Sequence, residues 1–214
     1  MKKSILSLVI TVALAGIANA GSVVFSNFGA PFTQVQADGV AIPAVSGFIA
    51  VGTTADTAGD LQLLQADLAA NGGTMSTAAR DLLASKFIQF GDAVQFGFNG
   101  FDGFFQGNAQ ADGGAADFNG RDIIMVAGNG ATLAGSTGLL IVQGGTFGPD
   151  APVFSANVGL SDTVLFGAAG GSGDVAGTPV GAFQMGNVGD VIPEPGVSIL
   201  ALFSAGLLVL RRRR

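Results

Sequence analysis

The sequence predicts a mainly β protein: a single β-sandwich-like domain with one or two packed α-helices, plus a C-terminal transmembrane helix. Short runs of branched and aromatic residues recur along the middle of the chain, bounded by Gly, Asn or Asp. Glycine is frequent, at 35 of 214 residues, which suits tight turns between short strands. One stretch between the predicted strands has the apolar spacing of an amphipathic helix.

The beginning of the chain has the pattern of a secretory signal peptide. Two lysines precede an apolar run over residues 5–17, and an Ala-x-Ala cleavage site follows, formed by Ala18 and Ala20. As a helix this run extends only about 20 Å, less than the roughly 30 Å hydrocarbon core of a bilayer. We therefore expect signal peptidase to cut after Ala20, and residues 21–190 to form an exported domain.

Seven segments of this domain have the composition of β-strands. The turn signals between them favour a sandwich or a flattened barrel. Alternation of apolar and polar positions is weak, because alanine and glycine dilute it, so no register is predicted. The predicted strands cover residues 23–25, 47–51, 94–98, 122–127, 139–142, 163–166 and 181–185.

Two helices are predicted between the second and third strands. From Met75 to Phe90 apolar residues recur at helical spacing with polar residues opposite them, and Ser76 and Gly91 are the expected N-cap and stop. A shorter helix is expected over residues 60–70, ended by an Asn-Gly-Gly turn. Helices this short are marginal alone, so we expect the pair to pack on the sheet. Recognition of a partner helix is the alternative.

An uncharged apolar segment, Val197–Leu210, lies near the C-terminus and is followed by Arg211, Arg212, Arg213 and Arg214. As a helix it extends about 21 Å, and arginine stems that reach back to the interface lengthen the effective span. The arginines belong on the cytoplasmic side by the positive-inside rule. The segment therefore predicts a membrane helix that leaves the domain outside.

A Pro-Glu-Pro triplet, Pro193, Glu194 and Pro195, precedes this segment. Each proline fixes its own φ and biases the preceding residue away from the helical region. The triplet therefore predicts an extended, exposed stretch, which is the form that a protease binds.

Together, the signal peptide, the Pro-Glu-Pro triplet, the apolar helix and the arginine cluster resemble the PEP-CTERM proteins of Gram-negative bacteria. The resemblance covers residues 191–214 and the signal peptide, and not the domain between them. It implies that the tail is a sorting signal for an exosortase-like membrane protease, which removes the helix near the triplet. It also implies residence at the cell surface or in a biofilm matrix, with exopolysaccharide as a partner.

The composition excludes several functional classes. Cysteine, histidine, tryptophan and tyrosine are absent, which removes disulfides, thiolate or imidazole metal sites and the Ser-His-Asp triad. Residues 21–196 carry three basic and fifteen acidic residues. Nucleic acid is therefore a poor partner for this acidic domain, and an anionic membrane surface is equally poor.

A set of Asp and Asn residues in a glycine-rich stretch is the densest polar group. Hard oxygen ligands on loops suit Ca²⁺, although their spacing is not that of an EF-hand. The same residue types are ordinary in turns, where they bond to local backbone amides. Both interpretations stay open, and no other cofactor is expected. The candidate ligands are Asp102, Asp112, Asp117, Asn119 and Asp122.

We therefore expect a non-enzymatic surface or matrix protein with a structural or adhesive role. A calcium-dependent extracellular binding module is one alternative, and a hydrolase with paired aspartates is another. Phe98, Phe101, Phe104 and Phe105 form a cluster that reads as core or, if exposed, as a binding patch.

Overall fold

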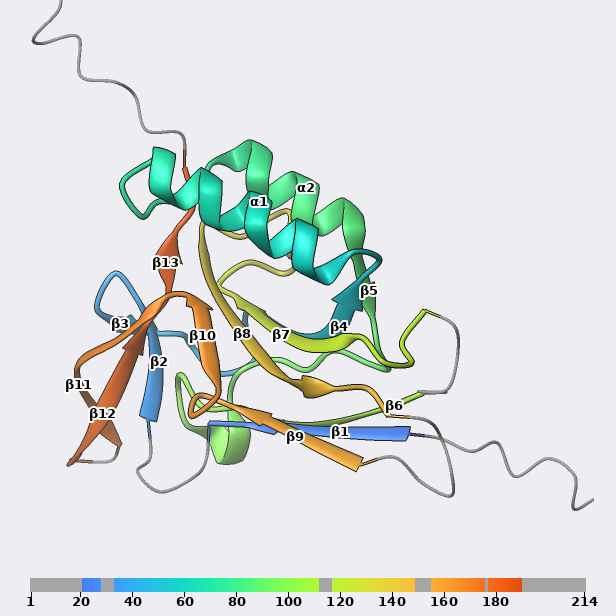
Figure 1. Cartoon of the computed structure of the whole chain (residues 1–214). Helices are drawn as coiled ribbons and strands as arrows, with labels where there is room; N and C mark the ends of the chain where they lie inside the picture. The colour runs from blue at the N-terminus through green and yellow to red at the C-terminus, as the bar shows by residue number, and fades with distance from the viewer. Residues whose placement is uncertain (1–20, 28–32, 112–116, 149–154, 176, 190–214) are drawn as a thin grey trace, which may run out of the picture.

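The computed structural model describes residues 21–27, 33–111, 117–148, 155–175 and 177–189. These residues form three β-sheets and two α-helices, so the expectation of a mainly β domain with packed helices is confirmed (Figure 1). In the part of the chain that is described, no helix is long and apolar enough to cross a membrane. The predicted membrane helix at 197–210 lies outside that part.

The centre of the molecule is a six-stranded sheet whose three middle strands are antiparallel; two of them are almost completely buried, and the third is buried over its first five residues. Its strands follow the order β10-β8-β7-β4-β5, with β13 paired to β8. The strands are β4 (Phe48–Thr54), β5 (Phe87–Gln89), β7 (Asp122–Gly128), β8 (Gly138–Thr146), β10 (Thr163–Phe166) and β13 (Gly186–Asn187).

Alternate residues of these strands enter two different cores, because both faces of the central sheet are covered. In β7, Ile123 and Met125 belong to one apolar cluster, whereas Ile124 and Val126 belong to the other. The sequence of a strand that is buried on both faces is a continuous apolar run, without polar residues at alternate positions. The weak alternation in the sequence therefore has a second cause besides dilution by alanine and glycine.

Two smaller sheets cover one face of the central sheet, and all three contribute to a single core. Phenylalanines fill much of this core, among them Phe25, Phe90 and Phe105. One sheet has the order β6-β1-β9 and the other β11-β12-β2-β3. Their strands are β1 (Gly21–Ser26), β2 (Thr33–Ala37), β3 (Val40–Ala41), β6 (Gln106–Ala111), β9 (Ser155–Gly159), β11 (Ala168–Val175) and β12 (Thr178–Gln184).

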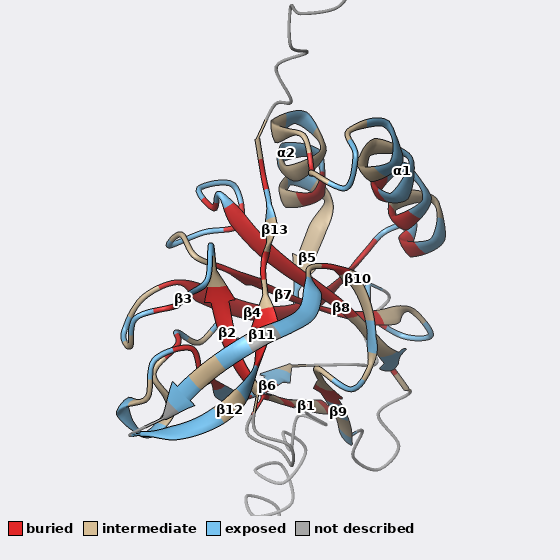
Figure 2. Cartoon of the chain, turned by 90° about the vertical axis from the view of Figure 1, so that its left-hand side faces the viewer, coloured by how far each residue is buried: buried red, intermediate tan, exposed pale blue. Residues whose placement is uncertain are grey.

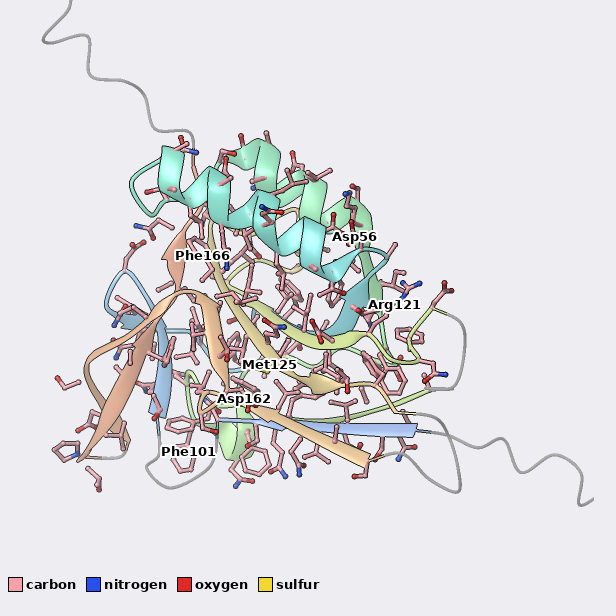
Figure 3. All side chains as sticks on the ribbon, in the orientation of Figure 1. Asp56, Phe101, Arg121, Met125, Asp162 and Phe166 are labelled. Carbon is pink, nitrogen blue, oxygen red and sulfur yellow. The ribbon has the colours of Figure 1, made fainter. Side chains whose placement is uncertain are left out.

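The helices α1 (Thr57–Ala70) and α2 (Thr77–Lys86) cover the opposite face. Leu61 and Leu64 of α1 and Leu83 of α2 pack against the central strands in the second core. Figure 2 shows the buried side of each helix turned toward the sheet and the exposed side turned to solvent. In Figure 3, Met125 lies in the interior, and Phe166 lies beneath the helix pair. The expectation that the pair packs on the sheet is thus confirmed.

The second helix is shorter than its apolar spacing predicts. It begins after the predicted N-cap Ser76 but ends at Lys86, and Phe87–Gln89 form strand β5. These residues pair with β4, where a glycine at position 52 lets the two backbones approach closely. The predicted stop at Gly91 was therefore wrong, because pairing with a sheet edge overrode helical spacing.

The strand predicted over residues 94–98 is also absent. Val94 forms an isolated bridge with Ile49, and Gly97, at a φ of 113°, turns the chain into a short 3-10 helix at Phe98–Gly100. Only glycine adopts such a φ without strain. The other six predicted strands are present.

Several strands escape prediction because their sequences contain few branched or aromatic residues. Glutamine side chains hold two of them in place. Gln34 Nε2 donates to the backbone oxygens of Asp102, at 3.0 Å, and Asp174, at 3.3 Å. Gln36 Nε2 donates to the Ser172 oxygen at 3.3 Å. These buried amides connect β2 to β11 across the sheet, a contact that local propensity does not reveal.

Candidate functional site

The structure separates one predicted calcium ligand from the others. Asp102 lies in the turn before β6, where its Oδ1 accepts a hydrogen bond from the Ala44 backbone N–H at 2.7 Å. Asp117 and Asn119 lie in an exposed turn beyond the other end of β6. Figure 3 shows Phe101, the neighbour of Asp102, and Arg121, which follows the turn, far apart in the molecule, so Asp102 does not share an ion with that turn.

The remaining candidates give no formed site. Asp122 begins β7, and its Oδ2 accepts a hydrogen bond from Gln143 Nε2 at 2.9 Å. Asp112 lies outside the described residues. Within the described ranges, no group of three His, Cys, Asp or Glu side chains is placed to hold a metal ion. Calcium binding near Asp117 and Asn119 stays a prediction.

The processing signals lie outside the structure's described ranges. This holds for the cleavage site at Ala18 and Ala20, for the Pro-Glu-Pro triplet, and for the arginines at positions 211–214. The position of the last described residue, Gly189, is fixed by backbone hydrogen bonds. Its N–H donates to the Met75 oxygen at 3.0 Å, and the Met75 N–H donates to the Asn187 oxygen at 3.1 Å. The tail therefore leaves the domain beside the start of α2.

Two of the four residues of the predicted phenylalanine cluster belong to the core. Phe104 and Phe105 are 1% and 0% exposed, whereas Phe98 and Phe101 are half-buried. Phe101 packs edge-on against Phe104 with ring centroids 6.4 Å apart. The interpretation as core is confirmed for Phe104 and Phe105, and no exposed aromatic patch forms here.

The outer face of the helix pair is the strongest candidate for a functional surface. A capping network fixes the connection between the helices. The Ser76 hydroxyl accepts a bond from the Ala79 N–H at 3.1 Å and donates to Asp67 Oδ1 at 2.6 Å. Asp67 Oδ2 accepts a bond from the Ser76 N–H at 2.8 Å. Asp67 of α1 thus orients the first turn of α2.

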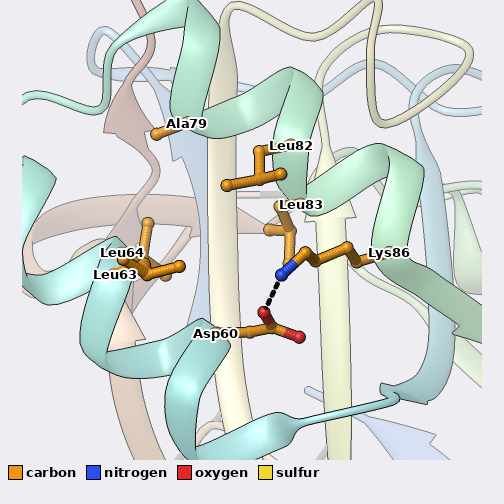
Figure 4. A pocket seen from close by; sticks show the side chains of 7 residues that line it. All are labelled: Asp60, Leu63, Leu64, Ala79, Leu82, Leu83 and Lys86. Atoms are coloured by element: carbon orange, nitrogen blue, oxygen red, sulfur yellow. Dashed lines mark hydrogen bonds and ion pairs between the residues drawn. The ribbon is translucent and has the colours of Figure 1, made fainter.

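An ion pair joins the other ends of the two helices. Lys86 Nζ contacts Asp60 Oδ1, as Figure 4 shows, and the two side chains are 38% and 7% exposed. Burial raises the pKa of Asp60, but the Lys86 ammonium and the Thr54 hydroxyl lower it by more, so its pKa lies below the ordinary 3.8. The carboxylate is therefore charged at neutral pH and bonded to the only lysine of the domain.

A shallow crevice lies between the helices. Its volume of about 40 Å³ accommodates a water molecule or two, far less than the roughly 300–1,000 Å³ of small-molecule sites. Two exposed leucines, Leu63 and Leu82, border it at 55% and 43% exposure. The geometry suits contact with a surface rather than capture of a ligand. The lining residues are Asp60, Leu63, Leu64, Ala79, Leu82, Leu83 and Lys86.

A larger hollow of about 370 Å³ lies between the two small sheets. None of the described residues that line it is charged. The amide of Asn27 at its edge is already bonded, through Nδ2 to the Gly103 oxygen at 2.8 Å and through Oδ1 to the Phe105 N–H at 2.8 Å. This hollow offers a ligand no charged group for recognition, so we assign it no role.

Comparison with known proteins adds no relative. No protein-family model, curated protein or solved structure matches the chain.

Sequence reasoning missed the Asp60–Lys86 pair. The signal was present: the two residues lie on helices joined by an Asn-Gly-Gly turn, and such a hairpin brings the start of the first helix beside the end of the second. The buried carboxylate and its cation lie at those two ends.

Proposed function

We propose that the chain is an exported protein of the cell surface or extracellular matrix of a Gram-negative bacterium, with a structural or adhesive role and no enzymatic activity. A C-terminal membrane helix anchors it until an exosortase-like protease removes the tail. One observation carries the proposal: signal peptide, Pro-Glu-Pro triplet, apolar segment and arginine cluster occur in that order in one chain.

The boundaries of the domain support this processing. Gly21, the first residue after the predicted cleavage site, begins β1 and pairs with Ala111. Its neighbour Ser22 pairs with Ser155 of β9. At the other end Gly189 closes the domain through its bond to Met75. These hydrogen bonds and strand pairings attach Gly21 and Gly189 to the body of the domain.

The chemistry of the described carboxylates supports a role other than hydrolysis. A glycosidase needs a carboxylic acid with a raised pKa opposite a second carboxylate. The pKa of Asp60 is shifted in the opposite direction, and its charge is bonded to Lys86. Asp102 and Asp122 accept hydrogen bonds from the Ala44 backbone and the Gln143 side chain, which fits a structural role.

The layer arrangement supports the expected sandwich. We propose that the central sheet forms one layer and that the two small sheets together form the other, with the phenylalanine-rich core between them. The helix pair adds a third layer outside this sandwich.

Mass spectrometry of the termini of the protein, produced in a bacterium with an exosortase system, tests the proposal. We expect the cell-bound and released forms to begin at Gly21, and the released form to lack residues 211–214. A variant with Pro193, Glu194 and Pro195 all replaced by alanine should keep these arginines and stay in the membrane fraction. A released product that ends at Arg214, or a product retained in the cytoplasm, would contradict the proposal.

A further inference from the structure

We propose that, while the tail holds the protein in the membrane, the outer face of α1 and α2 rests on the lipid surface, with Leu63 and Leu82 entering the headgroup region. This inference rests on the proposed function, because it requires the tail to span the bilayer. It adds an orientation and a lipid-contacting surface to that anchored state.

The chain leaves the domain beside the helix pair. Gly189 is bonded to Met75, the residue before the N-cap of α2. Seven residues, 190–196, separate Gly189 from the apolar segment, and even fully extended they reach only about 25 Å. The two small sheets lie on the far side of the central sheet. The short connection therefore keeps the helix layer nearer to the bilayer than the rest of the domain.

The exposed face of the helix pair carries few charged residues. Only one of its exposed residues is charged, Asp81, and it forms an ion pair with Arg80 at 2.8 Å. Leu63 and Leu82 are two of the four large apolar residues that are exposed in the described parts of the chain. The exposed residues are Ala58, Gln62, Leu63, Gln65, Ala66, Ala69 and Ala70 of α1, and Ala78, Asp81, Leu82 and Ser85 of α2.

Both basic residues of the helix layer are paired with carboxylates. Residues 56–86 contain four acidic and two basic residues, and the two basic residues, Lys86 and Arg80, form ion pairs with Asp60 and Asp81. Phosphate groups repel carboxylates at short range, within about a Debye length of 8–10 Å. Because Asp60 and Asp81 are each paired with a cation, the repulsion between these carboxylates and the headgroups is reduced at the helix layer.

A membrane surface fits this face better than the tail itself does. The crevice between the helices, at about 40 Å³, is too small to receive the fourteen-residue helix predicted over Val197–Leu210. A bilayer needs no groove, because leucines insert between headgroups singly.

Single-cysteine labelling tests the proposal, since the chain has no cysteine of its own. The variants Leu63→Cys and Leu82→Cys carry an environment-sensitive NBD label on the helix face. Val40→Cys and Val45→Cys are matched controls, because these valines are 68% and 78% exposed and lie outside the helix pair. Each full-length variant is reconstituted in phosphatidylcholine vesicles, and its emission is compared with that of the same variant truncated after Gly189 and free in solution.

The expected result is a blue shift and a rise in emission at positions 63 and 82 in vesicles, with no change at positions 40 and 45. If the chain floats with the vesicles but all four labels behave alike, this inference fails and the anchored state stands. If the chain does not float with the vesicles, the proposed function fails first. A blue shift in the truncated protein that grows with protein concentration would show a second copy on this face, and would also overturn the inference.

Discussion

Asp60 of α1 links the two helices through its ion pair with Lys86 of α2. Its side chain is 7% exposed, yet it remains charged because Lys86 of the other helix contacts it. A buried charge without its partner is costly, and the cost falls when one partner reaches solvent, as Lys86 does at 38% exposure. We therefore expect the pair to contribute more to the free energy of unfolding than a surface ion pair does, and less than a fully buried one does.

Replacing this carboxylate tests how much the ion pair contributes to stability. We expect Asp60→Asn to lower the free energy of unfolding by about 1–2 kcal/mol at pH 7, below the 3–5 kcal/mol typical of a fully buried pair. Urea unfolding followed by circular dichroism measures the change. Asp81→Asn is the matched control, since Asp81 is 60% exposed and its pair with Arg80 should contribute at most about 0.5 kcal/mol.

The same variant has a defined pH signature. The pKa of Asp60 is lower in the folded chain than its ordinary 3.8, so the ionised carboxylate favours folding above that value. This stabilisation disappears as the pH falls through the folded-state pKa. The difference between the wild type and Asp60→Asn should therefore shrink below about pH 4. A difference that stays constant down to pH 2 would contradict this account of the pair.

At the scale of elements, the junction of α2 and β5 decides where the helix stops. The apolar spacing continues through Phe87 and Phe90, but Phe87 pairs with Thr54 at the sheet edge, and Phe90 enters the core with Phe118 and Phe147. Periodicity alone cannot separate these outcomes, because both bury the same residues. The close approach at Gly52 is what makes the pairing possible.

Substitution of Gly52 tests the junction. A Cβ at this position would lie 2.2 Å from the Ile88 oxygen, so Gly52→Ala must push β5 away from β4. We expect a loss of about 1–3 kcal/mol in unfolding free energy, as for other overpacked sites. Gly145→Ala in β8 is the control, because its Cβ would meet nothing within 4 Å, and its stability should change by less than about 0.5 kcal/mol. Equal losses in the two variants would contradict this interpretation.

At the scale of the whole molecule, protection should decrease from the centre outward. The strands β4, β7 and β8 are buried on both faces, whereas the β11–β12 hairpin is largely exposed, as Figure 2 shows. Amide hydrogen exchange should therefore be slowest in the three central strands and faster by orders of magnitude in the hairpin. Similar protection in both would contradict the layered account of stability.

The sequence predicted the elements that carry strong local signals. Six of the seven predicted strands, both helices and the N-cap Ser76 are present in the structure. It could not predict β2 or β11, since buried amides of Gln34 and Gln36 hold these polar strands through contacts far away in the chain. The exposed face of the helix pair could not be predicted either, for a similar reason. Which leucines stay exposed depends on where the sheet lies, and the sequence does not state that.

The bond between Gly189 and Met75 has a mechanical consequence. If matrix outside the cell pulls on the domain while the tail is embedded, the load enters at Gly189 and passes first into β13, a strand of two residues paired to β8. So short a strand peels away under much smaller force than the long buried strands behind it. Detachment of β13 would then lengthen the connection to the membrane while the buried central strands stay folded.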